Sequence, residues 1–473
     1  MAPKRNISDL RNDGDGKTHS EREEAEEAQE PPHTKLRLSS RSPPPSFHQI
    51  QQESPVPTPL PEPKTLTYPP QTPITKQTPF QLPTQVLSFS YSDQHELEFT
   101  DSALRYFVGP PLGAKLGYGY DRWVRKPDTR GRIDALLRAI GKAKEDSKKR
   151  GMVEGVGVVC WRGVMTRILT APYEDRDGWE MNVMLVNGTL YFEEHLSDEK
   201  LKDKNNMAPR QRLQTYYGYA FESYCTSETQ TRRSSSSPSY PDAPFGWSGD
   251  VNTNVQWCSV VRTKLGDTRM IIGGEVDCVR GKYTGKTDSF VELKTSMTIR
   301  GAQDEARFEK KLLKFYFQSF LLGVPEIFVG FRTPAGVVIT TQSFKTMELP
   351  RLVRGKPGAW DPLVCLAWGH RFLTFLRDVV QQQGNTPVWR AKFVPGSGAT
   401  VRRLDEDDVV DVVGGEERVG FLPRWYWEEA RTQIAPHAQP SEEHRTHGPP
   451  RPMAASASSS GTSTSAVATG WQI

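Results

Sequence analysis

Two short stretches of the sequence place charged side chains where a buried strand needs apolar ones. In "FVELKTSM" (290–297), Glu292 and Lys294 share one face of an extended chain, because successive side chains of a strand point to opposite faces. The earlier stretch "GGEVDCV" places Glu275 and Asp277 on one face in the same way. The glycine-containing stretch between them is expected to turn the chain. If the two strands pair as a hairpin, these four side chains converge on one side of one sheet.

Three carboxylates in such proximity repel one another, and their burial without partners is costly. A divalent cation removes this conflict, since Mg²⁺ or Mn²⁺ prefers oxygen ligands and keeps some water for chemistry. Lys294 adds a positive charge that can stabilise a phosphate in a transition state. Asp277 and Glu292, fifteen positions apart, together with Lys294 resemble the PD-(D/E)XK nuclease pattern. An exposed edge strand with alternating charges is the alternative, and it suffices for 292–294 taken alone.

Periodicity and turn signals predict the elements that must hold these residues. Helices are expected over 131–150, 206–225, 304–322 and 361–383. Strands are expected within 156–169, 179–195 with a turn at Asn187-Gly188, 255–265, 268–279, 289–297, 326–333 and 336–346. Runs of strands with a few long helices predict an α+β domain with a central mixed sheet covered by helices.

The composition divides the 473 residues into one large ordered block and flexible segments. Residues 1–83 are proline-rich and poor in large aliphatic side chains, and 432–473 are rich in Ser and Ala, so both are predicted to be disordered. A flexible insertion is expected at about 227–249. The remaining block, 84–431, is the predicted catalytic domain. The net charge of +4 permits a nucleic-acid partner without indicating one.

The cysteines and the apolar runs indicate an intracellular protein without a membrane partner. There are five cysteines at wide spacings, without a CxxC pair: Cys160, Cys225, Cys258, Cys278 and Cys365. This pattern argues against a disulfide framework or a zinc site. No apolar run reaches the roughly 18 residues that a membrane helix needs, and the N-terminus lacks a signal peptide.

Six separated motifs, in this order, resemble the decapping nucleases of the DXO type, most closely their fungal nuclear branch, which partners a 5′–3′ exoribonuclease. The resemblance covers most of 100–430. The motifs are "VCWRGVMTRILTAPYE" (159–174), "GYAFESY" (218–224), "NTNVQWCSVVRT" (252–263), "GGEVDC" (273–278), "VELKTS" (291–296) and "KLLKFYFQSFLLGVP" (311–325).

The resemblance implies a role for each matching residue. It implies a catalytic set of Glu222, Glu275, Asp277, Glu292 and Lys294. It implies that one or two Mg²⁺ or Mn²⁺ ions are held by Glu222, Glu275, Asp277, Glu292 and the backbone carbonyl of Leu293. It implies substrate contacts from Trp161, Arg162, Gly163, Cys258, Glu275, Lys294 and Gln318, with Lys294 and Gln318 at the scissile phosphate.

Several of these residues also have simpler structural interpretations. Cys258 lies in an apolar strand and could be a packed small hydrophobe. Gln318 could cap a sheet edge, Arg162 could be a surface residue on a strand, and Glu222 could be an ordinary helix carboxylate. The aromatic run 315–317 is predicted to fill a helix–sheet interface rather than to stack on bases.

The resemblance implies a nuclear, metal-dependent enzyme that acts on RNA 5′ ends. The implied substrates are NAD-capped RNA, from which NAD is released, incompletely methylated caps, and 5′-triphosphate RNA, which is hydrolysed to the 5′-monophosphate. The nuclear 5′–3′ exoribonuclease is the implied protein partner. Two alternatives remain open: the same fold with its own distributive 5′–3′ exoribonuclease activity, and a non-catalytic scaffold that stabilises the exoribonuclease.

Overall fold

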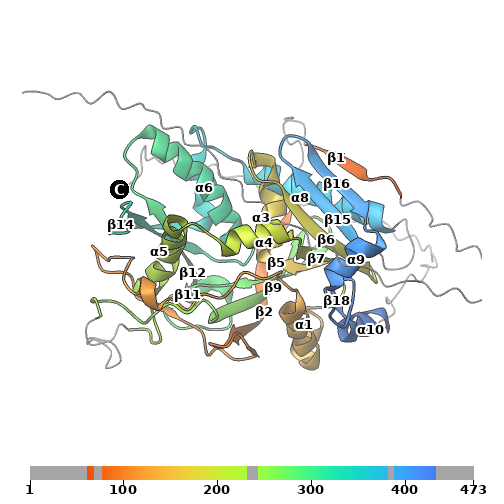
Figure 1. Cartoon of the computed structure of the whole chain (residues 1–473), viewed down its shortest axis with the longest axis horizontal. Coiled ribbons are helices and arrows are strands. Elements are labelled where there is room, and N and C mark those ends of the chain that lie inside the picture. Colours follow the sequence, from red (N-terminus) through yellow and green to blue (C-terminus); the bar gives the residue numbers. More distant parts are fainter. Residues whose placement is uncertain (1–60, 69–76, 232–242, 382–387, 433–473) are drawn as a thin grey trace, which may run out of the picture. The chain divides into compact units, whose positions relative to one another are not determined.

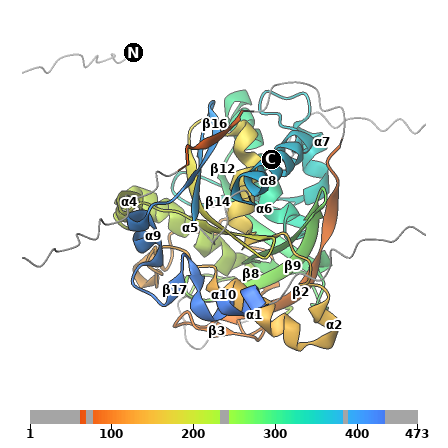
Figure 2. The same ribbon diagram turned by 90° about the vertical axis from the view of Figure 1, so that its right-hand side faces the viewer.

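The computed structural model describes residues 61–68, 77–231, 243–381 and 388–432. Within these residues the strands form a ten-stranded sheet, a six-stranded sheet and a two-stranded ribbon. Both large sheets mix parallel and antiparallel pairs, as the α+β prediction requires. The expected single central sheet is therefore divided in two. Figures 1 and 2 show the helices packed against these sheets.

The ten-stranded sheet has, in spatial order, β1 (Lys64–Thr67), β16 (Gly398–Arg403), β15 (Trp389–Val394), β6 (Trp179–Val186), β7 (Thr189–Glu194), β5 (Val158–Trp161), β10 (Thr268–Glu275), β9 (Gln256–Leu265), β2 (Phe80–Tyr91) and β3 (Leu97–Glu98). The six-stranded sheet has β14 (Val338–Lys345), β13 (Glu326–Arg332), β12 (Phe290–Met297), β11 (Cys278–Val279), β4 (Tyr106–Phe107) and β8 (Thr226–Ser227). The ribbon pairs β17 (Arg418–Val419) with β18 (Leu422–Pro423).

The helices among the described residues are α1 (Asp134–Glu145), α2 (Ser147–Arg150), α3 (Arg162–Thr170), α4 (Asp198–Asn205), α5 (Pro209–Cys225), α6 (Ala302–Phe320), α7 (Leu349–Val353), α8 (Pro362–Gln381), α9 (Glu406–Val413) and α10 (Arg424–Thr432). None of them is long and apolar enough to cross a membrane.

Successive side chains of a strand point to opposite faces of its sheet, so each large sheet contributes apolar side chains to a separate core on either face. Helices α3, α6 and α8 share one core with both sheets. Helices α1 and α10 cover the other face of the ten-stranded sheet, and α5 covers the other face of the six-stranded sheet. The aromatic run 315–317 of α6 is buried in the shared core, as predicted. The two sheets are thus held together by one helical layer.

Most predicted elements are confirmed, and one is wrong in an important way. The hairpin at Asn187-Gly188 forms as β6 and β7, and the long helices at 209–225, 302–320 and 362–381 are present. The stretch 156–169, predicted as a strand, changes to helix at Arg162. Its apolar residues then continue at helical spacing on the buried side of α3.

The predicted boundaries of the flexible segments also need correction. The arm was expected to extend to residue 83, but Lys64–Thr67 form β1 and β2 begins at Phe80. Strand β1 pairs with β16. The sequence did not predict this strand, because it has few apolar residues and lies in a proline-rich stretch. Residues 1–60, 69–76 and 433–473 lie outside the described residues. The same holds for 232–242 of the insertion, whereas Trp247, at its far end, packs against Tyr224 with ring centroids 5.0 Å apart.

Candidate active site at the junction of the sheets

The chain passes from one sheet to the other within the Glu-Val-Asp motif. Strand β10 ends at Glu275 in the ten-stranded sheet, and β11 begins at Cys278 in the six-stranded sheet. The expectation of one continuous hairpin within one sheet is therefore wrong, although β11 and β12 do pair antiparallel. This crossing places Glu275 and Asp277 where the two sheets meet, beside Glu292 of β12.

Glu292 is the most deeply buried of these carboxylates, with 1% of its side chain exposed. Its Oε1 accepts from Lys294 Nζ at 2.6 Å and from Arg162 Nη1 at 3.1 Å. Burial alone would raise the pKa of Glu292, but the two cations outweigh it and lower the pKa to about 2. The other oxygen, Oε2, is buried and accepts no hydrogen bond from a described residue. Oε1 is therefore held by two cations, whereas Oε2 remains available as an acceptor or as a ligand for a cation.

Asp277 is held against the edge of β12. Its Oδ2 accepts from the backbone N–H of Leu293 at 2.6 Å. Strand β11 pairs with β12 only as far as Val291, so the N–H of Leu293 has no strand partner on that side. In an extended strand the C=O of a residue points to the same side as its N–H. The carbonyl of Leu293 therefore points to the same side of β12 as Asp277, and the resemblance implies that this carbonyl is a metal ligand.

Glu222, Glu275 and Asp277 line one cavity between α5 and the sheet junction. Burial and the neighbouring carboxylates raise the pKa of Glu222 well above its usual range and the pKa of Asp277 to about 7. The pKa of Glu275 is raised by burial, although Arg162 opposes this rise. Gln256 Nε2 donates to Glu275 Oε2 at 2.9 Å and so orients the carboxylate. The acidic residues predicted from the sequence are thus brought close enough together to raise one another's pKa.

Two consecutive glycines make room for the arginine motif. A Cβ on Gly273 of β10 would lie 2.8 Å from Cζ3 of Trp161, and one on Gly274 would lie 2.9 Å from Cβ of Arg162. Real side chains do not approach so closely. Residues 273–274 of the "GGEVDC" stretch therefore allow β10 to lie against the start of α3. This contact brings Arg162 within reach of Glu292.

The remaining predicted residues lie around this centre in different ways. The Cys258 Cα is the register partner of Glu275 in the β9–β10 pair, and Cys258 lines a second cavity of about 460 Å³ together with Glu275 and Trp161. The Gln318 side chain is half-buried on α6, and the backbone carbonyl of Gln318 accepts from Arg162 Nη1 at 3.5 Å. Gly163 is exposed on the first turn of α3.

Tyr91, His95 and Lys126 are among the residues of the second cavity that the sequence analysis did not identify. The His95 ring stacks on Tyr91 with centroids 4.1 Å apart, and Lys126 Nζ donates to His95 Nε2 at 2.5 Å. They come from residues 84–130, for which the sequence analysis predicted no helix or strand, and Tyr91 ends strand β2. His95 has a φ of 63°, an uncommon conformation for a non-glycine residue, but nothing in the sequence indicates it.

The donor set fits a divalent cation in its chemistry. Four interacting carboxylates face two cations, so an added positive charge would relieve their repulsion, and Glu292 Oε2 is an unused buried ligand atom. The side chains are not, however, already closed around an ion. Among the described residues, no three acidic, His or Cys side chains form a group that could hold a metal as they stand. Binding would require a rearrangement of these side chains.

The fold and this acidic junction define the class of the protein as a PD-(D/E)XK-type nuclease fold. The family model described as "RAI1 like PD-(D/E)XK nuclease" matches residues 81–427. The chain therefore belongs to the RAI1-like family of PD-(D/E)XK nucleases, as the motifs predicted.

Individual relatives agree with this assignment. The chain is 37% identical over 445 residues to a protein named Decapping nuclease RAI1 from Mycosarcoma maydis, covering 74% of this chain and 87% of that one. It is 32% identical over 367 residues to the Decapping and exoribonuclease protein of Xenopus laevis, covering 73% and 86%. The crystal structure of S. pombe Rai1 in complex with 3′-FADP has a TM-score of 0.59 at 26% identity, covering 73% of this chain and 100% of that chain.

Proposed function

We propose that this protein is a metal-dependent hydrolase that processes the 5′ ends of RNA. It would remove NAD caps with release of NAD, remove incompletely methylated caps, and convert 5′-triphosphate RNA to 5′-monophosphate RNA. The proposal extends the activity named for its fungal relatives, which are decapping nucleases, to three particular ends. The observation that carries it is the buried Glu292, held by Arg162 and Lys294 beside Asp277, Glu275 and Glu222 at the sheet junction.

The charge balance of the site supports the need for a divalent ion, Mg²⁺ or Mn²⁺. Four carboxylates against two cations would repel the phosphates of an RNA end. The residues proposed to hold the ion are Glu222, Glu275, Asp277, Glu292 and the carbonyl of Leu293. A bound divalent ion would neutralise phosphate charge and supply an activated water at neutral pH.

The side chains around the ion site have separate tasks. Arg162 uses one nitrogen, Nη1, for Glu292 and Gln318, and its other guanidinium nitrogens bond to no described residue. A planar guanidinium suits a phosphate oxygen pair, so we assign Arg162 to bind the 5′ phosphates. Lys294 is 22% exposed and keeps its positive charge, because Glu292 and Asp277 raise its pKa against the effect of burial. It can therefore stabilise charge on a phosphate in the transition state.

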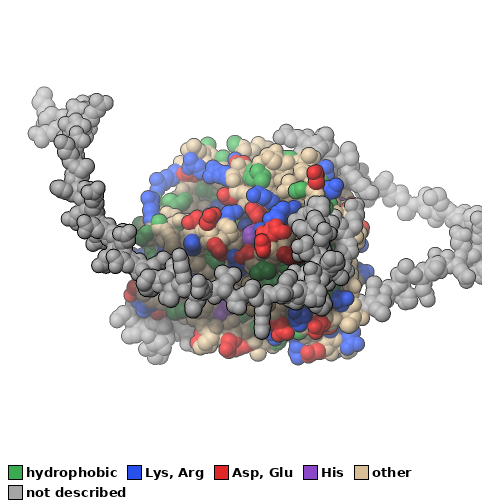
Figure 3. Space-filling model, turned by 45° about the vertical axis from the view of Figure 1, so that its right-hand side comes forward, with side chains coloured by type: hydrophobic (Ala, Val, Ile, Leu, Met, Phe, Trp, Pro, Cys, Tyr) green, Lys and Arg blue, Asp and Glu red, His purple; other side chains and the backbone are tan. Residues whose placement is uncertain are grey.

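The cavities, rather than a broad surface charge, are expected to select the substrate. On the face shown in Figure 3, acidic and basic side chains are interspersed. The second cavity adjoins Glu275 and has an aromatic and cationic lining, which suits a nucleotide at the 5′ end. The binding of 3′-FADP by a Rai1 relative supports the inclusion of nucleotide-capped ends.

A second candidate function is distributive 5′–3′ exoribonuclease activity. It is favoured by the similarity to a relative named Decapping and exoribonuclease protein. We also propose that the protein acts in the nucleus with a 5′–3′ exoribonuclease, which would degrade the monophosphorylated product. The motifs of the fungal branch support that partnership. A non-catalytic scaffold is less well supported, because the acidic set, Arg162 and Lys294 are all present.

One experiment separates these functions. NAD-capped, incompletely methylated capped, 5′-triphosphate and 5′-monophosphate RNAs are incubated with the protein, with Mn²⁺ or with EDTA, and the released fragments are identified by mass spectrometry. Decapping predicts NAD, a cap dinucleotide and pyrophosphate from the first three, and only with the metal. Stepwise shortening of monophosphate RNA would establish the exoribonuclease. No product from any RNA would leave the scaffold function and contradict the proposal.

A further inference from the structure

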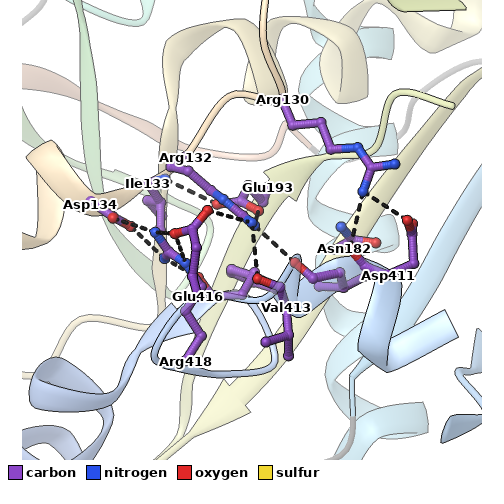
Figure 4. Close-up of polar contacts among 12 residues, drawn as sticks. Arg130, Arg132, Ile133, Asp134, Asn182, Glu193, Asp411, Val413, Glu416 and Arg418 are labelled. Atoms are coloured by element: carbon purple, nitrogen blue, oxygen red, sulfur yellow. Dashed lines mark hydrogen bonds and ion pairs between the residues drawn. The ribbon is translucent and has the colours of Figure 1, made fainter. Parts of the chain in front are cut away.

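A network of ion pairs lies beside the second cavity and links segments distant in the sequence (Figure 4). Its centre is Arg132, just before α1. Its Nη1 donates to Glu193 Oε2 of β7 at 3.1 Å and to the carbonyl of Val412 at 3.0 Å. Its Nη2 donates to the carbonyl of Val413 at 3.3 Å and to Glu416 Oε1 at 3.1 Å. The guanidinium thus joins β7 to the end of α9.

The backbone next to this guanidinium is fixed by the same carboxylate. Glu193 is 3% exposed, and its Oε1 accepts from the backbone N–H of Ile133 at 3.1 Å. Gly414 ends α9 in the left-handed conformation, with φ of 63°, and a Cβ there would lie 3.2 Å from Arg132 Nη2. The C-terminal segment therefore packs closely around Arg132, and the peptide of 132–133 has little freedom to move.

The fixed peptide contacts a wall of the second cavity. The indole Nε1 of Trp161 donates to the carbonyl of Arg132 at 3.0 Å. Both residues line the 460 Å³ cavity that also contains Glu275 and Cys258. On its other side, the indole lies against Gly273, where even a Cβ would not fit. Trp161 is thus confined between β10 and the Arg132 carbonyl, directly before Arg162.

We propose that Arg132 is a positioning residue: it fixes the peptide that holds the Trp161 indole, and so gives the C-terminal segment 406–419 a part in shaping the substrate cavity. This inference rests on the proposed hydrolysis of RNA 5′ ends. Arg132 does not contact the reacting atoms. It acts through Trp161, so its loss should weaken substrate binding more than it slows the chemical step.

A double-mutant cycle tests whether Arg132 acts through Trp161. The proteins are the wild type, Arg132→Met, Trp161→Phe and the double variant, all as full-length chains. Trp161→Phe keeps an aromatic ring and removes the N–H donor. Arg280→Met is the control, because Arg280 also donates to carboxylate oxygens through two guanidinium nitrogens, here both to Glu326 at 2.8 and 2.6 Å, but lines neither cavity. Arg132→Lys serves as a second variant if Arg132→Met folds poorly.

The readouts are kcat and KM for 5′-triphosphate RNA in Mn²⁺, with thermal unfolding recorded for each protein. We expect Arg132→Met to raise KM about tenfold, or about 1.4 kcal/mol, with kcat within about threefold of the wild type. The double variant should be no worse than the poorer single variant, because both changes release the same indole. Arg132→Lys should recover part of the loss, and Arg280→Met should leave KM unchanged.

Each contrary result has a distinct meaning. If KM of the Arg132 variants equals that of Arg280→Met, the inference is overturned while the proposed function stands. Effects of Arg132→Met and Trp161→Phe that multiply in the double variant would show that the two residues act independently, which also overturns it. If the wild type hydrolyses no 5′-triphosphate, capped or NAD-capped RNA, the proposed function itself fails.

Discussion

The molecule contains two ionic clusters with different roles, one around Arg132 and one at the junction of the sheets. Around Arg132, both terminal nitrogens of the guanidinium donate to carboxylates and backbone carbonyls, and Arg418 likewise pairs with Asp134 through both of its terminal nitrogens. At the sheet junction, four carboxylates face only Arg162 and Lys294, and Glu292 Oε2 has no hydrogen-bond partner among the described residues. A cluster that stabilises a fold satisfies its polar groups, whereas the junction leaves an unmet demand for positive charge.

The largest expected effect is on activity at the junction. Asp277→Asn or Glu292→Gln should lower hydrolysis of triphosphate RNA by at least about a hundredfold, because each removes a negative ligand without changing shape. Circular dichroism should show an intact fold. Activity within about tenfold of the wild type would show that these carboxylates are not needed for hydrolysis, so the junction would not differ in function from the Arg132 cluster.

A glycine substitution tests the geometry that joins the clusters. Gly274→Ala should lower activity by about tenfold or more, because its Cβ would lie 2.9 Å from Cβ of Arg162 and must displace it. The control is Gly141→Ala in α1, where a Cβ meets nothing within 4 Å and should add about 0.5–1 kcal/mol of stability. Steady-state rates and thermal melts measure both variants. Unchanged kcat and KM in Gly274→Ala would show that Arg162 need not occupy its observed position.

The pH dependence of stability should reveal the cost of burying Glu193 in the Arg132 network. Burial raises the pKa of Glu193 to about 7, which the nearby Arg132 and Arg418 offset only in part. The folded protein then keeps a proton that the unfolded chain releases above its ordinary value of 4.5, so stability falls as pH rises from about 4.5 to 7. Between pH 4.5 and 7, the free energy of unfolding of the wild type should fall by at most about 3 kcal/mol relative to that of Glu193→Gln.

Urea denaturation of both proteins at a series of pH values measures that difference. If the difference in free energy of unfolding between the two proteins stays constant between pH 5 and 7, Arg132 keeps Glu193 ionised throughout. The positive charges of the cluster would then balance the charge of Glu193 more fully than its raised pKa indicates.

The smallest effect on activity is expected from strand β1, which lies apart from both clusters. Tyr68 packs next to β1, and its hydroxyl donates to the carbonyls of Ala171 and Pro172 at 3.0 and 2.6 Å. A chain that starts at residue 69 loses this packing and these hydrogen bonds, so its free energy of unfolding should be about 1–3 kcal/mol lower than that of a chain that starts at 61. Its melting temperature should be several degrees lower. The activity of each folded molecule should not change. A lower kcat in the shorter chain would connect β1 to the site.

The sequence predicted which side chains meet at the junction better than it predicted the architecture of the sheets. Alternation of charged and apolar side chains identified Glu275, Asp277, Glu292 and Lys294, because strand periodicity is local. It could not show that the chain changes sheets at Val276, since pairing partners are set by tertiary contacts. A continuous apolar run likewise did not distinguish strand from helix at Arg162.

The residues that the sequence did not reveal depend on long-range contacts. Arg132 and Glu193 are sixty-one positions apart and meet only through the sheet. The strand at 64–67 becomes visible only through its partner β16. His95 and Lys126 come from connecting segments, where side-chain type says little about what a cavity contains.

Calorimetric titration of Mn²⁺ into the wild type and into Asp277→Asn tests the central claim most directly. If the junction carries an unmet demand for positive charge, the wild type should bind Mn²⁺ saturably and Asp277→Asn should bind it at least about tenfold more weakly. Equal binding by the two proteins, or none by the wild type, would contradict the account.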